Sequence, residues 1–135
     1  MRLVALPLAL LLAACPRAGG GNECNTDEQC DGEVCGRDLT CTDASNVREV
    51  RTTWTISGQA ATGTSCGGRE LYITYQSDDS SDALSYSPVP CSTGQYLIDK
   101  LPKRYHSIEL GVSGGSTFAT VPIGATNMVS VDLVF

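Results

Sequence analysis

Between residues 47 and 135, apolar and polar residues alternate with a period close to two. In residues 49–56, Val50, Trp54 and Ile56 alternate with charged or threonine positions. Successive side chains of a β-strand point to opposite faces of its sheet, so this pattern predicts a strand with one buried and one solvated face. The same signal predicts seven strands, at residues 50–56, 71–75, 84–86, 96–98, 105–112, 117–123 and 129–135.

Glycine, proline, serine and aspartate gather between these strands, as turns and loops require. No stretch carries an apolar stripe with a period of 3.6 residues, so we expect a helix content near zero. About seven short strands within about ninety residues are typical of a sandwich. The fold class predicted for residues 47–135 is therefore all-β, a β-sandwich of about seven antiparallel strands.

The N-terminal segment has the composition of an export signal. A charged start precedes an apolar run over residues 3–12, which is too short for a membrane-spanning helix of about 20 residues. The run ends in Leu12-Ala13-Ala14-Cys15, which resembles the lipobox of bacterial lipoproteins. This resemblance implies that residues 1–14 are a signal peptide cleaved before Cys15, and that Cys15 carries a covalent lipid. An ordinary secretory signal is the alternative.

A lipid on Cys15 predicts a location in the cell envelope, where the membrane is contacted only through acyl chains. Residue 16 is Pro16 rather than aspartate. An aspartate there resembles an inner-membrane retention signal, so the outer membrane is the favoured location, with a periplasmic or surface-facing orientation left open. Residues 15–21 include three consecutive glycines and form the predicted lipidated, flexible tether.

Six further cysteines remain, an even number that predicts disulfides in an exported, oxidising setting. Four gather within residues 22–46, the predicted disulfide-rich segment, and two stand apart: Cys24, Cys30, Cys35, Cys41, Cys66 and Cys91. The four allow three pairings. Pairing Cys24 with Cys35 and Cys30 with Cys41 is favoured, because interlocked loops constrain a segment poor in apolar residues more than separate rings do. The remaining two cysteines then close a loop of about 25 residues.

Zinc coordination by four thiolates is the alternative for the clustered cysteines. The lack of a C-x-x-C pair, the lack of a nearby histidine and the oxidising compartment all favour disulfides. In cysteine density and spacing, residues 22–43 resemble the small disulfide-rich repeats of EGF-like or Dickkopf-like type found in secreted proteins. This resemblance implies a small disulfide-stabilised unit and indicates no ligand.

The formal net charge is −6. This value argues against electrostatic binding of nucleic acid or of an anionic bilayer, since both need clustered lysine and arginine. Acidic residues concentrate in the disulfide-rich segment, where Asp27, Asp31 and Asp38 with Gly32 partly resemble a calcium loop. The pattern departs at Gln29 and at Asp38, where calcium loops carry Asp or Asn and a bidentate Glu. A solvated acidic face without a cofactor is favoured, and calcium on the three carboxylates is the alternative.

The later strands of the predicted sandwich carry a distinctive corner. Its residues are Gly94, Leu97-Ile98, Leu101-Pro102, Tyr105, Ile108, Leu110 and Val112. They resemble the L-P-x-G-x-Y-x-V corner of carboxypeptidase-regulatory-like, prealbumin-like domains, with Lys103-Arg104 in place of the usual glycine. The resemblance implies a seven-stranded β-sandwich that serves as an accessory or binding module without catalysis.

A small exported hydrolase or metal-dependent enzyme is the alternative function. Residues 111–115 match G-x-S-x-G around Ser113, and the chain has one histidine, His106. A nucleophile elbow needs a following helix and a later histidine, and neither follows Ser113, so a glycine-rich hairpin turn is favoured. Cys66 could act as a nucleophile only if Cys91 were unpaired.

Six aromatic residues are candidates for a carbohydrate-stacking face: Trp54, Tyr72, Tyr75, Tyr86, Tyr96 and Tyr105. Trp54 has the buried parity of its strand, whereas Tyr72 has the solvated parity and is the predicted binding residue. The predicted function is a cell-envelope lipoprotein that presents a non-catalytic β-sandwich to an envelope protein or a glycan. A purely structural envelope component is the third alternative.

Overall fold

The structure, a computed structural model, describes residues 23–79 and 81–135. The predicted signal peptide, the lipidation site Cys15 and the tether over residues 15–21 lie outside the described residues. Within the described part, no helix has both the length and the apolar character needed to cross a membrane.

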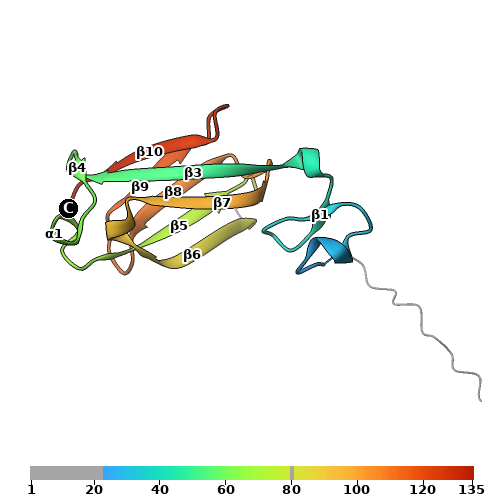
Figure 1. Cartoon of the computed structure of the whole chain (residues 1–135). Coiled ribbons are helices and arrows are strands. Elements are labelled where there is room, and N and C mark those ends of the chain that lie inside the picture. The colour runs from blue at the N-terminus through green and yellow to red at the C-terminus, as the bar shows by residue number, and fades with distance from the viewer. Residues whose placement is uncertain (1–22, 80) are drawn as a thin grey trace, which may run out of the picture.

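All seven predicted strands are present. They are β3 (Val47–Ile56), β5 (Glu70–Gln76), β6 (Ala83–Pro90), β7 (Gln95–Pro102), β8 (Ser107–Val112), β9 (Phe118–Pro122) and β10 (Met128–Leu133). They form two sheets that face each other across one core, with the long strand β3 running the length of the body (Figure 1). The prediction of an all-β sandwich is confirmed.

The first sheet is built around β3. One edge of β3 pairs with β10, and the other edge pairs with β7 and with the short strand β4 (Gln59–Ala60). The pairing of β10 with β3 is parallel, so the prediction of a purely antiparallel sandwich is wrong for this pair. Parallel neighbours need a long connection between them. Here the whole chain from β4 to β9 forms that connection, and β10 enters the first sheet after β9, a strand of the second.

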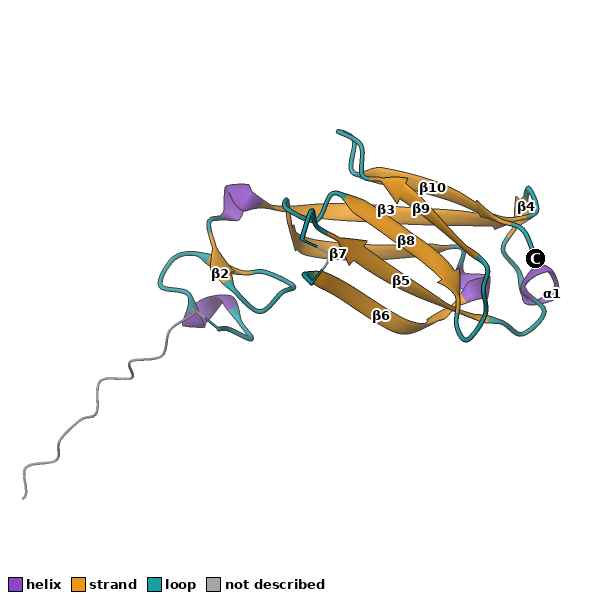
Figure 2. Cartoon of the chain, turned by 180° about the vertical axis from the view of Figure 1, so that it is seen from behind, coloured by secondary structure: helices purple, strands orange, loops and turns teal. Residues whose placement is uncertain are grey.

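The second sheet has the strand order β6-β5-β8-β9, and all its pairs are antiparallel (Figure 2). Its register places Tyr72 of β5 opposite Gly111 of β8, and Gly111 opposite Phe118 of β9. Leu71, Ile73 and their neighbours on the same parity point inward and are fully buried. The alternate parity therefore forms a continuous outer face on this sheet.

The inner faces of the two sheets form the core. Trp54 is buried as predicted, and its indole N–H donates a hydrogen bond to the backbone carbonyl of Cys91 at 2.8 Å. Cys66 and Cys91 form the predicted disulfide beside it. Aliphatic side chains, together with Tyr75 and Tyr105, fill the rest of the core, and burying each aliphatic side chain contributes about 1.5–3 kcal/mol.

The sequence predicts a helix content near zero, but the structure contains short helical turns. One turn of α-helix, α1 (Gly63–Cys66), lies between β4 and β5, and three 3-10 turns occur elsewhere: η1 (Asp27–Gln29), η2 (Ala44–Asn46) and η3 (Cys91–Thr93). Thr62 and Ser65 cap the start of α1 reciprocally, and Gly67 ends it with a φ of 56°. A four-residue helix is too short to show an amphipathic period, so only these caps signal it in the sequence.

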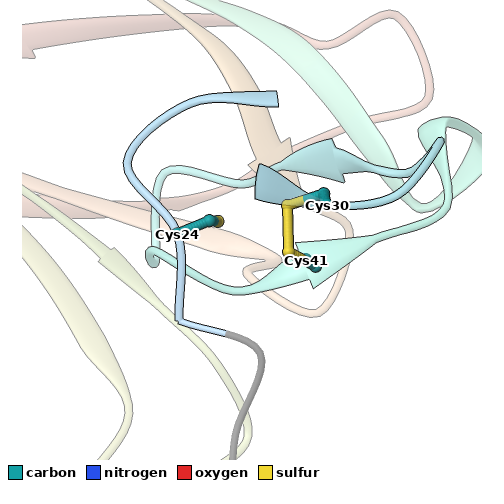
Figure 3. A group of neighbouring side chains, drawn as sticks. All are labelled: Cys24, Cys30 and Cys41. Carbon is teal, nitrogen blue, oxygen red and sulfur yellow. A yellow bond between two sulfur atoms is a disulfide. The ribbon is translucent and has the colours of Figure 1, made fainter. Parts of the chain in front are cut away.

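The disulfide-rich segment lies at one end of the sandwich, opposite α1 and the C-terminus (Figure 1). It contains β1 (Val34–Cys35) and β2 (Cys41–Thr42), which pair antiparallel. Its bonds are Cys24–Cys35 and Cys30–Cys41, so the favoured interlocked pairing is confirmed. The sulfur atoms of Cys24, Cys30 and Cys41 lie within 4.8 Å of one another (Figure 3). The sulfur atoms of all four clustered cysteines, Cys35 included, are in disulfides, so none of them is free to bind zinc.

The turn between β7 and β8 needs no glycine. The backbone N–H of Tyr105 donates to the carbonyl of Pro102 at 3.1 Å, and neither Lys103 nor Arg104 has a positive φ. Lys103 and Arg104 therefore form a turn that ordinary residues can adopt, at the position where the sequence resemblance would expect a glycine. Tyr105 is fully buried behind this turn.

Candidate binding site

Tyr72 lies on the outer face of the second sheet, as its strand parity predicts. Its ring is partly exposed. The other aromatic candidates are not on this face: Trp54, Tyr75 and Tyr105 are buried, and Tyr86 and Tyr96 pack against the core. Tyr72 is thus the one member of the predicted set that faces outward among the described residues.

The Tyr72 ring lies over Gly111 of the neighbouring strand β8. A Cβ atom at Gly111 would come within 2.6 Å of the Tyr72 hydroxyl oxygen and 2.7 Å of two ring carbons. Real Cβ contacts are never this short, so the phenol end of Tyr72 occupies the space that any other residue would need. The absence of a side chain at position 111 is what lets Tyr72 lie across β8.

A second aromatic ring flanks Gly111 on the other side. Phe118 of β9 stands directly opposite Gly111 and is 58% exposed. Phe118 is absent from the aromatic residues predicted above to form a binding face. Strand parity would have found it, because Ala119 and Val121 alternate with it and pack against the core. Tyr72 and Phe118 therefore present two rings on one face, separated by a glycine.

Hydrogen-bonding side chains continue this face along the sheet. Glu109 accepts a hydrogen bond from the Tyr72 hydroxyl at 2.8 Å and another from the Gln76 side-chain amide at 3.4 Å. Thr74 and Ser85 share a hydroxyl hydrogen bond of 2.9 Å beside them. Partial burial and the bond to Glu109 raise the pKa of Tyr72, so its hydroxyl stays protonated and donating. The face combines apolar rings with aligned polar groups.

The residues proposed for calcium do not form a common site. Asp27 receives the Lys100 ammonium at 2.6 Å and the backbone N–H of Cys35 at 2.9 Å. Asp38 pairs with Arg104 at 2.5 Å, and Asp31 is an exposed turn residue with a φ of 47°. Among the described residues, these three carboxylates do not form a cluster that could share an ion. Two of the three carboxylates that would form the calcium loop are instead paired with Lys100 and Arg104 of the sandwich.

Those ion pairs attach the disulfide-rich segment to the sandwich. Besides Asp27–Lys100 and Asp38–Arg104, a third pair joins Arg37 to Asp99. The expectation of a merely solvated acidic face is therefore too simple. In two of the three pairs the carboxylate belongs to the disulfide-rich segment and the cation to the sandwich, and in the third pair Arg37 is the cation and Asp99 of β7 the carboxylate.

We expect the stability of the protein to fall in acid. Hydrogen bonds from Lys100 and from the Cys35 backbone lower the pKa of Asp27, and those from Arg104 and Tyr105 lower the pKa of Asp82. A carboxylate with a lowered folded-state pKa contributes stability that is present above the unfolded value, about 3.9, and is lost as pH falls through the folded value. Urea unfolding midpoints should therefore drop below about pH 4. The variant carrying Asp27→Asn and Asp82→Asn should show a shallower drop, and an equal drop would contradict this origin.

The hydrolase motif forms a turn, as favoured. Ser113 and Gly114 belong to the connection from β8 to β9, where Gly114 has a φ of 72°. The Ser113 hydroxyl contacts the Ser87 hydroxyl at 3.2 Å. His106 precedes β8 whereas Ser113 follows it, and the His106 ring contacts Asp78 at 3.1 Å. The structure does not bring His106 and Ser113 together as a nucleophile and base.

The outer face of the second sheet is thus the best-defined candidate for binding in the described chain. Its members come from three adjacent strands: Tyr72, Gln76, Glu109, Gly111 and Phe118. Comparison with protein-family models, with curated proteins and with solved structures gave no match to this chain.

Proposed function

We propose that this chain is a cell-envelope lipoprotein, anchored through a lipid on Cys15, whose β-sandwich binds a glycan on the outer face of the second sheet without catalysis. The sequence Leu12-Ala13-Ala14-Cys15 supports the anchor, and the three disulfides suit an exported protein. The observation that carries the binding proposal is the pair of rings, Tyr72 and Phe118, on either side of Gly111.

A glycan fits this face better than a protein partner does. Protein interfaces gather aromatic residues at a core depleted of charge. Here the Tyr72 hydroxyl donates to the Glu109 carboxylate, which also accepts from the Gln76 amide, and the hydroxyls of Thr74 and Ser85 lie on the same face. A sugar ring has apolar C–H faces and a rim of hydroxyls, which match aromatic rings and aligned polar side chains respectively.

Replacing the two rings should abolish glycan binding while the fold is kept. The full chain, purified in a non-ionic detergent, is sedimented with insoluble peptidoglycan, chitin or cellulose. We expect at least one of these to retain it, and the double variant Tyr72→Ala, Phe118→Ala to be retained at least tenfold less, since each lost ring contact costs about 1 kcal/mol or more. Leu97→Ala is the matched control, because Leu97 is an exposed apolar residue on the first sheet, at 50% against 58% for Phe118.

Gly111→Ala tests the geometry rather than the chemistry of the site. The added methyl group must push the Tyr72 ring off β8 and so break its hydrogen bond to Glu109. Retention should fall as it does when Tyr72 itself is replaced. The glycan proposal is wrong if none of the three polymers retains the wild-type chain, or if the ring variants are retained as well as Leu97→Ala. Intact mass of the same native preparation reports whether Cys15 carries lipid.

A further inference from the structure

The basic side chains of the described residues fall into two groups. Four of the seven have partners: Arg37 contacts Asp99, Lys100 contacts Asp27, Arg104 contacts Asp38 and Asp82, and Arg69 lies 4.4 Å from the centre of the Phe135 ring. The other three are Arg48, Arg51 and Lys103, and within the described chain none of them has a carboxylate oxygen within 4.0 Å.

These three unpaired cations line a single hollow of about 670 Å³. The hollow lies between the start of β3, the turn after β7 and residues 126–128, at the end of the sandwich that faces the disulfide-rich segment (Figure 1). It belongs to the first sheet and is therefore separate from the glycan face on the second. Glu49 also lines it, but its carboxylate lies beyond 4.0 Å from each of the three cations.

Arg48 is held rigidly in this hollow. Its guanidinium donates to the backbone carbonyl of Tyr105 at 2.6 Å and to the side-chain oxygen of Asn127 at 3.3 Å. Its Nε is buried and has no hydrogen-bond partner. Burial lowers the pKa of this guanidinium, as expected for a cation that loses water without gaining a counter-ion. Such a group is costly unless an anion approaches it.

We propose that this hollow binds a phosphate group, with Arg48 fixed beside it and the exposed side chains of Arg51 and Lys103 closing on it. Three positively charged side chains that line one hollow match a phosphate, which carries up to two negative charges on several acceptor oxygens, better than a single carboxylate. The chain is acidic overall, so a positively charged site results from where these three side chains lie and not from the amino-acid composition. The phosphate can belong to a lipid headgroup or to a soluble phosphate ester.

Titration of the full chain in non-ionic detergent with inorganic phosphate, followed by calorimetry, tests the site. We expect saturable binding that weakens about fivefold in Arg51→Gln and in Lys103→Gln, because each loses one charge-assisted contact. Both residues are exposed at the surface, so neither variant should unfold the protein. Arg69→Gln is the matched control: it removes one positive charge in the loop that follows α1, and binding should change less than twofold.

Two further probes distinguish the sources of the phosphate. Tighter binding of dihexanoyl phosphatidylglycerol than of glycerol 3-phosphate assigns the site to a lipid headgroup, and the reverse assigns it to a soluble ester. The proposal is overturned if none of the three phosphates binds in the millimolar range, or if Arg51→Gln and Arg69→Gln weaken binding equally. Neither result bears on the glycan site, because Tyr72 and Phe118 lie on the other sheet.

Discussion

Replacing Cys66 and Cys91 together by alanine will lower the free energy of unfolding by about 3.5 kcal/mol. The disulfide joins residues 25 positions apart, and closing a loop of that length removes this amount of conformational entropy from the unfolded chain. Both cysteines are 2% exposed and belong to the core. The bond therefore stabilises the sandwich itself rather than an appendage.

Urea unfolding of the double variant and of the wild-type chain measures this difference, with tryptophan fluorescence as the probe. Trp54 is a suitable reporter, because it is the only tryptophan and donates a hydrogen bond to the Cys91 carbonyl. Replacing Cys30 and Cys41 is the control, since that bond lies in the separate cluster of the disulfide-rich segment. A loss below about 1 kcal/mol in the Cys66 and Cys91 variant would contradict the loop-entropy origin.

The strand pattern in the sequence predicts the two faces of the sandwich well. A period of two assigns each side chain to one face without knowledge of its neighbours. Ile73, Tyr75 and Trp54 are buried as this rule predicts, while Tyr72 lies outside. The cysteine count predicts the disulfides, but the clustered four allow three pairings, and the sequence only favoured the one that the structure shows.

What the sequence does not predict is how distant segments meet. The parallel pairing of β10 with β3 depends on which sheet the chain enters after β9, and no local pattern encodes that choice. The same holds for the candidate site. Gly111 reads as a turn residue in the sequence, and only the register of β5 with β8 shows that it lies under the Tyr72 ring. Likewise, only the register of β8 with β9 shows that Phe118 lies opposite Gly111.

The ion pairs show most clearly that local sequence patterns do not predict contacts between distant segments. Asp27 and Asp38 stand at spacings that suggest a local calcium loop, but their partners Lys100 and Arg104 are 73 and 66 residues away along the chain. Local spacing alone cannot separate a carboxylate that binds a metal ion from one that pairs with a distant cation. The fold decides, because it places the β7–β8 connection against the disulfide-rich segment.

Replacing Arg104 by alanine will cost about 2 kcal/mol, more than any other single ion pair of this contact. Arg104 reaches Asp38 at 2.5 Å and Asp82 at 2.6 Å, and Asp82 accepts the hydroxyl of buried Tyr105 at 2.5 Å. Burial by itself lowers the pKa of Arg104, but the hydrogen bonds and charges of Asp82 and Asp38 together raise it above its usual value, and burial with the bond to Asp82 raises the pKa of Tyr105 to about 12. The side chain of Asp38 is only 4% exposed, so without Arg104 its charge is buried and uncompensated.

Two further variants separate this cause from a general loss of surface charge. Arg37→Ala removes the neighbouring pair with Asp99, in which both side chains are about half exposed, and should cost less than about 1 kcal/mol. Adding Asp38→Asn to Arg104→Ala should restore part of the lost stability, because the amide removes the stranded charge while keeping an acceptor for Thr40. If Arg104→Ala and Arg37→Ala cost the same in urea unfolding, burial of Asp38 is not what makes this contact strong.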